Sequence, residues 1–221
     1  TLLGVVIEKV AYTPLRSAPR LSLLITAIGI SFLLENGAQL LFGTDTKSMA
    51  QDPLIPGTLT LGGVSITYAA LITILVSVVS MVALTLLVQR TKLGKAMRAV
   101  SEDMGAAQLM GISLNRTISF TFAVGSALAG IGSVLHIASY FQASPMMGSM
   151  LGLKAFVAAV LGGIGSIPGA MIGGFAIGVV ETLVTAAGLS TWKDGVVFAI
   201  LIVVLLLKPT GILGKQITEK V

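Results

Sequence analysis

The sequence predicts an all-α integral membrane protein, a polytopic helical bundle of about six spans. Of the 221 residues, 55% are hydrophobic and 10% are charged, and the mean hydropathy is +0.99. Soluble domains carry about 25% charged residues. Long apolar runs alternate with short polar stretches, and in hydrocarbon only a helix or a closed barrel satisfies its own backbone. We therefore expect one transmembrane domain over 1–221, built from helices.

The first half of the chain contains three apolar runs. Residues 1–6 are expected to complete a span whose beginning is missing, so we expect a fragment that lacks its N-terminal helices. A polar loop over 8–20 precedes a span over 21–42, because about 20 apolar residues cross a bilayer. A second polar loop over 43–63 ends in TLTLGGVSI, which predicts a small strand or an extended segment, and a span over 64–88 follows.

The second half begins with a polar central loop over 89–117 and a span over 118–141. The next apolar stretch, 153–187, is interrupted by Gly and Pro, which predicts either two helices around a tight turn or one crossing with a re-entrant piece. A last helix is expected over 195–207, followed by a polar tail. Four glycines at small-x-x-x-small spacing are expected at helix contacts: Gly169, Gly173, Gly174 and Gly178.

Composition argues against several classes of function. There is no Cys and one His, so neither a disulfide framework nor a metal site is expected. Gly94-Lys95 and Gly214-Lys215 lack the Ser or Thr of a phosphate-binding loop, so we expect no nucleotide hydrolysis and no catalytic residues here. The pI is near 9.7, but the basic residues lie in short loops. Membrane orientation explains them better than nucleic acid does.

The positive charges predict the orientation of the chain. Eleven of the 14 Lys and Arg residues lie in the first loop, the central loop and the tail. Short cytoplasmic loops carry an excess of Lys and Arg. The central loop and the tail are therefore expected in the cytoplasm.

The central loop is expected to form two short amphipathic helices that present an apolar stripe to another protein. Met97, Val100, Met104 and Ala107 share one face at helical spacing, and Lys95, Arg98 and Glu102 share another. Gly111 is the expected stop. A solvated connecting loop is the alternative.

A few polar residues fall inside or near apolar runs, namely Glu35, Asn36, His136 and Glu181. Charges in hydrocarbon are costly and usually face a cavity or a partner. A substrate pathway is one interpretation; the others are an interfacial position for Glu35, a backbone-bonded His136 and a helix cap for Glu181. Gly163 and Gly165 mark the break, where exposed helix N–H groups would suit a carboxylate. A surface turn is the alternative.

Three stretches carry a resemblance: GKAMRAVSEDMGAAQLMGISLNR, LKAFVAAVLGGIGSIPGAMIGG and LLLKPTGILG. Together they resemble the permease subunit of branched-chain amino-acid ABC importers. The resemblance implies a bacterial inner-membrane protein that imports Leu, Ile and Val with a second permease, two cytoplasmic ATPases that bind ATP and Mg, and a periplasmic or lipid-anchored binding protein. It places the ATPase contact in 89–117.

Other functions remain open at this stage. Permeases similar in sequence carry urea, short amides or other amino acids. A secondary transporter would use Glu35, His136 and Glu181 as a proton relay and would not need an amphipathic coupling loop. A membrane-embedded lipid enzyme would need a catalytic cluster, which the sequence does not show.

Overall fold

A computed structural model of the chain describes residues 1–15, 18–48, 57–61, 64–208 and 210–214. The chain divides into two compact units, Thr1–Met146 and Met147–Val221. Three basic residues that entered the charge count, Arg16, Lys215 and Lys220, lie outside the described residues.

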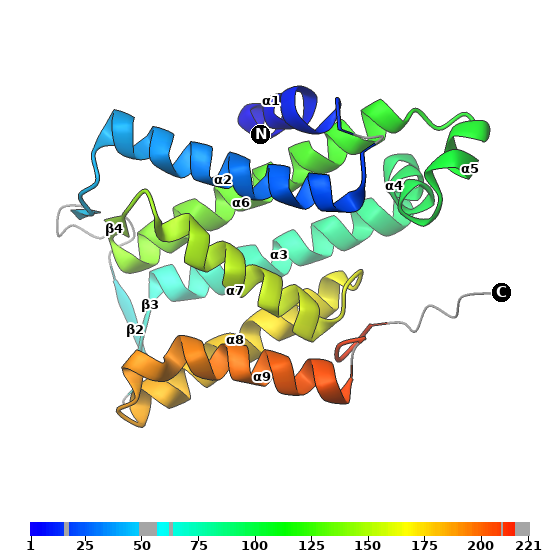
Figure 1. Cartoon of the computed structure of the whole chain (residues 1–221). Coiled ribbons are helices and arrows are strands. Elements are labelled where there is room, and N and C mark those ends of the chain that lie inside the picture. Colours follow the sequence, from blue (N-terminus) through cyan, green and yellow to red (C-terminus); the bar gives the residue numbers. More distant parts are fainter. Residues whose placement is uncertain (16–17, 49–56, 62–63, 209, 215–221) are drawn as a thin grey trace. The chain divides into compact units, whose positions relative to one another are not determined.

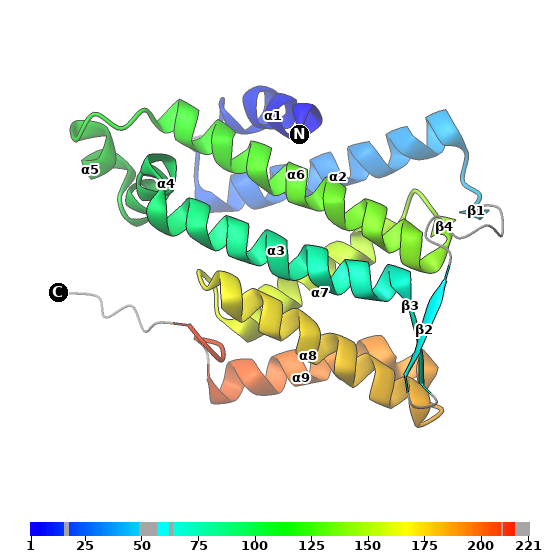
Figure 2. The same cartoon turned by 180° about the vertical axis from the view of Figure 1, so that it is seen from behind.

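The described part of the first unit is mainly helical (Figure 1). In order, its helices are α1 (Leu2–Ile7), the π-helix η1 (Glu8–Tyr12), α2 (Arg20–Phe42), α3 (Tyr68–Arg90), α4 (Lys92–Glu102), α5 (Met104–Leu109) and α6 (Leu114–Tyr140). Helices α3 and α6 contact each other, and α4 and α5 lie at one end of this pair in both views (Figures 1 and 2). The predicted spans 21–42 and 118–141 are confirmed, although α6 begins four residues early.

Two small antiparallel ribbons lie in the same unit. Strand β2 (Thr58–Leu61) pairs with β3 (Val64–Thr67), and β1 (Lys47–Ser48) pairs with β4 (Gln142–Ala143). The small strand expected in TLTLGGVSI is therefore confirmed. The predicted start of the next span at residue 64 is wrong, because 64–67 pair as a strand before α3 begins.

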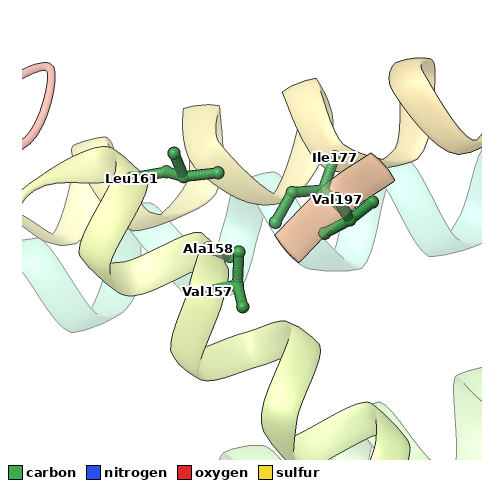
Figure 3. Packing of buried hydrophobic residues seen from close by; sticks show 5 residues of the cluster. All are labelled: Val157, Ala158, Leu161, Ile177 and Val197. Carbon is green, nitrogen blue, oxygen red and sulfur yellow. The ribbon is translucent and has the colours of Figure 1, made fainter. Parts of the chain in front are cut away.

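The second unit is a three-helix arrangement made of α7 (Met147–Gly162), α8 (Ile167–Ala186) and α9 (Lys193–Leu207), with a short 3₁₀ helix η2 (Ser190–Trp192) before α9. The interpretation of 153–187 as two helices around a tight turn is confirmed. The buried core consists of Val157, Ala158, Leu161, Ile177 and Val197, whose side chains gather where the three helices meet (Figure 3).

The surface of the molecule is that of a membrane protein. Within the described residues, five helices are long and apolar enough to cross a bilayer. The side chains of Leu40 and Leu41 on α2 are 88% and 80% exposed, as lipid-facing residues are. Helix α7 is shorter, at 16 residues or about 24 Å. The prediction of a polytopic all-helical membrane protein is confirmed.

Candidate functional site: the α4–α5 pair and the three-helix unit

Helices α4 and α5 form because the sequence caps each of them. The Thr91 hydroxyl accepts a hydrogen bond from the Gly94 N–H at 2.9 Å, which caps the start of α4. An Asp103 carboxylate oxygen accepts from the N–H groups of Gly105 and Ala106 at 2.8 and 3.0 Å, which starts α5. The two helices are thus separated by a single residue, as the expectation of two short helices required.

Helix α5 stops at the expected glycine. Gly111 has φ +81°, and its N–H donates to the Gln108 carbonyl at 3.0 Å. The next N–H, that of Ile112, donates to Ala107 at 3.0 Å, which completes a Schellman motif. A residue with a side chain at 111 would have to adopt left-handed backbone angles, so the end of the helix depends on glycine.

The apolar stripe is only partly available to another protein. Val100 and Ala107 are buried, with 7% and 4% exposure, so the expectation that they face a partner is wrong. They lie on helices that pack within their own chain, because α4 contacts α3 and α6, and α5 contacts α4 and α6. Met97 is half-buried, whereas Met104 is 56% exposed.

The exposed apolar surface of this pair lies mainly on α5 and just beyond it. Leu109 and Met110 are 91% and 82% exposed, which the helical spacing alone did not indicate. We call Met104, Leu109 and Met110 the α5 knob. Exposed charges lie on α4: Lys95, Arg98 and Glu102. The pair therefore offers exposed apolar side chains beside a charged helix, which suits a protein partner.

Gly94 lies where α4 contacts the end of α3. A Cβ at this position would overlap the carbonyl oxygens of Leu87 and Val88. Because these are backbone atoms, they cannot move away as a flexible side chain can. The backbone of α4 therefore lies directly against the end of α3.

In the second unit, the break between α7 and α8 is a defined turn closed by the chain's C-terminal motif. Gly163 and Gly165 have φ +103° and +92°. The Ile212 and Leu213 N–H groups donate to the carbonyls of Leu161 and Gly162 at 2.8 and 3.0 Å. These are terminal carbonyls of α7, which lack partners within their own helix. The Gly-rich segment and the Lys-Pro-Thr-Gly motif thus meet, although Pro209 itself lies outside the described residues.

Two of the four predicted packing glycines make the close helix contact. Cβ atoms at Gly169 and Gly173 would overlap the carbonyl oxygens of Gly162 and Ala158, respectively, on α7. Gly174 makes an ordinary contact with the Ala158 Cβ at 3.8 Å, and nothing lies within 4 Å of a Cβ added at Gly178. Within the described residues the prediction is wrong for Gly178, because that face of α8 points away from α7.

Glu181 belongs to an ion triad that the spacing of residues in the sequence did not predict. The Lys154 Nζ lies 2.7 Å from the Glu181 Oε1 and 2.8 Å from the Asp194 Oδ1. The three residues come from α7, α8 and α9, and their side chains are 22%, 24% and 32% exposed. Glu181 therefore pairs with a cation and does not cap a helix. The sequence feature that could have indicated this ion pair is a single lysine in one apolar helix and a single glutamate in the next.

The other polar residues of the predicted pathway lie in the first unit. The Asn36 Nδ2 donates to the Phe32 carbonyl one turn back at 2.7 Å, and Glu35 is half-buried beside it. The His136 ring lies 4.5 Å from the Tyr140 ring on the same helix. The predicted pathway through Glu35, Asn36, His136, Gly163, Gly165 and Glu181 stays a prediction.

Glu8 is the buried acid that the sequence analysis placed in a polar loop. Its exposed fraction is 0%, and it begins the π-helix η1. The loop assignment at 8–12 is wrong because these residues continue α1 and pack against α6. The spacing Gly4, Glu8, Tyr12 places one small and two polar residues on one face, and this was the signal.

Comparison with known proteins gives one consistent result. Residues 2–205 match the family model described as branched-chain amino acid transport system / permease component. The chain is 45% identical to the high-affinity branched-chain amino acid transport system permease protein BraD of Pseudomonas aeruginosa, over 99% of this chain and 72% of that protein. It is 45% identical to LivH of Salmonella typhimurium, over 97% and 71%. No solved structure matches.

Proposed function

The chain belongs to the branched-chain amino acid transport permease family, and we propose that it imports branched-chain amino acids as the permease subunit of an ATP-driven ABC importer. It is a multi-pass protein of the bacterial inner membrane and a transport component rather than an enzyme. The observation that carries the proposal is the α4–α5 pair. The pair contacts α3 and α6, and it exposes the apolar side chains of the α5 knob.

Energy enters through this pair in the proposed mechanism. Two cytoplasmic ATPase subunits bind ATP and Mg²⁺, and one of them receives the α5 knob. Val100 and Ala107 are buried, Gly94 lies against the α3 backbone, and α4 contacts both α3 and α6. These contacts support the proposal that motion of the pair is passed on to α3 and α6. Closure of the ATPases then tilts these two helices and exposes the transport path to alternate sides of the membrane.

The remaining partners follow from the proposed function and from the exposed surface. A second homologous permease is proposed to cover part of the apolar surface of the long helices. A periplasmic or lipid-anchored binding protein delivers the substrate. Leu, Ile and Val are proposed as substrates because the similar proteins BraD and LivH carry that name. Urea, short amides or other amino acids are the alternative cargo.

The docking role is tested by Met104→Asp. Residue 104 is the first of α5, where an acidic side chain is favourable to the helix, so the helix itself should persist. The charge would be buried in the ATPase contact. A loss of about 1.4 kcal/mol of binding free energy at this contact lowers the affinity for the ATPase tenfold. Because uptake depends on that contact, we expect ATP-dependent uptake to fall at least about tenfold.

The matched control is Ser101→Asp, which adds the same charge to the exposed face of α4 near its C-terminus. An acidic residue there is unfavourable to the helix, so the control is the harsher change for folding. Uptake into proteoliposomes and co-purification of the ATPases are measured for both variants. Normal coupling in Met104→Asp would remove α5 as the docking element.

The energy source separates this proposal from a secondary transporter. We expect uptake to need internal ATP and the binding protein. Accumulation driven by a pH gradient alone, with no ATP, would overturn the ABC proposal and favour a proton-coupled carrier.

A further inference from the structure

Glu8 occupies a position for which the proposed mechanism has no use so far. It is fully buried, although a buried polar or charged group is costly unless it is hydrogen-bonded. It also opens a π-helix, in which the Thr13 N–H donates to the Glu8 carbonyl five residues back at 2.9 Å. Single turns of π-helix occur frequently at functional sites. A role beyond packing is therefore worth testing.

Both carboxylate oxygens of Glu8 accept hydrogen bonds from hydroxyl groups. The Ser119 Oγ donates to Oε2 at 2.6 Å, and the Thr13 Oγ1 donates to Oε1 at 3.1 Å. The first distance is that of a hydroxyl bonded to a carboxylate, the stronger kind of hydrogen bond. It joins η1 to α6 across 111 residues of sequence.

The rest of the same helix face holds α1 and η1 tightly on α6. A Cβ at Gly4 would overlap the Ser126 hydroxyl, so the absence of a side chain at Gly4 lets Ser126 of α6 pack directly on the α1 backbone. The rings of Tyr12 and Phe122 lie 5.0 Å apart. The bond from Glu8 is thus one part of a continuous contact and is not a loose surface interaction.

This contact lies near the end of α6 that follows the α4–α5 pair. Ser119 is five residues after Leu114, where α6 begins. Helices α4 and α5 both contact α6, and their side chains Val100 and Ala107 are buried. Helices α4 and α5, which we call the coupling helices, therefore contact α6 as η1 does.

We infer that Glu8 is a positioning residue for coupling, which fixes the start of α6 to η1 through Ser119 so that motion of α4 and α5 is passed on to the bundle. The inference rests on the proposed function. Without this tie, the start of α6 yields locally and ATP hydrolysis continues with less transport. Removing the tie should therefore lower the substrate imported per ATP severalfold.

The experiment uses the assembled transporter in proteoliposomes and measures uptake and ATP hydrolysis together. The test variants are Ser119→Ala and Glu8→Gln, and Ser119→Thr keeps the hydroxyl. Ser133→Ala is the matched control, because the Ser133 hydroxyl lies exposed on the same helix and donates to the Gly130 carbonyl in its own helix. A merely structural role would reduce abundance, hydrolysis and uptake together and leave their ratio unchanged.

Amide hydrogen exchange of the purified permease gives a second readout that needs no ATPase. Ser119→Ala and Glu8→Gln should speed exchange across 92–117, whereas Ser133→Ala and Ser119→Thr should not. An unchanged import-to-hydrolysis ratio, or unchanged exchange in α4 and α5, would overturn the role of Glu8. Absence of ATP-dependent uptake in the unmodified complex would instead overturn the proposed function, and the exchange result would still decide whether the tie exists.

Discussion

The contact between α7 and α8 can be tested with one added methyl group. Gly173 lies in α8, where a Cβ would overlap the carbonyl oxygen of Ala158 and lie 3.1 Å from the Gly162 nitrogen. Gly173→Ala therefore forces the two helix backbones apart. Gly178→Ala is the matched control, because it lies in the same helix with nothing within 4 Å of the new Cβ.

The comparison isolates the contact. Replacing Gly by Ala inside a helix is favourable by about 0.8–1.0 kcal/mol, and this effect is common to both variants. Overpacking a close contact costs about 1–3 kcal/mol. The difference in the free energy of unfolding between Gly173→Ala and Gly178→Ala is therefore about 1–3 kcal/mol. At about 2–4 °C per kcal/mol for a chain of this length, Tm should differ by about 2–12 °C.

The assay is thermal denaturation of the detergent-solubilised permease, followed by the fraction that remains monodisperse on size exclusion. Gly178→Ala should match or exceed the unmodified protein, and Gly173→Ala should denature at lower temperature. Gly173→Leu should be worse still and should lose uptake. Equal Tm values for the two alanine variants would show that α7 and α8 do not approach each other through Gly173.

Two further changes probe the same unit. Lys154→Met leaves the carboxylates of Glu181 and Asp194 without their cation, which should lower the free energy of unfolding by about 1–3 kcal/mol. The loss is smaller than for a fully buried pair, because the side chains are about a quarter exposed. Adding Glu181→Gln should recover part of the lost Tm. Gly211→Ala should release the C-terminal motif, because residue 211 has φ +77° and its Cβ would lie 2.5 Å from the Gly163 Cα. Proteolysis of the tail measures this release. Gly188→Ala, at φ +81° in open space, is the control for backbone strain alone.

Much of this fold follows from patterns that are local in sequence. Apolar runs of about 20 residues gave α2, α3 and α6 to within a few residues. The two coupling helices were predictable because their caps and their stop lie within a few residues of each other, as Gly111 illustrates. The α7–α8 turn was predictable for the same reason, since glycine and proline determine the backbone locally.

The parts that could not be predicted depend on residues far apart in the chain. Lys154 lies near the start of the apolar stretch 153–187, yet it pairs with carboxylates 27 and 40 residues away. Glu8 looked like a loop residue because its partner Ser119 is 111 residues distant. Burial of Val100 and Ala107 likewise depends on tertiary contacts, and helical spacing shows which residues share a face but not what that face meets.

The second unit shows how a helix arrangement in lipid can be held together without a large hydrophobic driving force. Lipid tails are as apolar as leucine, so helix contacts need close packing or polar interactions. At the turn, backbone hydrogen bonds from Ile212 and Leu213 hold the end of α7. In the middle, Gly173 lets the α8 backbone reach α7. Beyond it, Lys154 ties α7 to both α8 and α9. Because hydrogen bonds, a close backbone contact and ion pairs join the helices at three separate levels, we expect these helices to move as one body during transport.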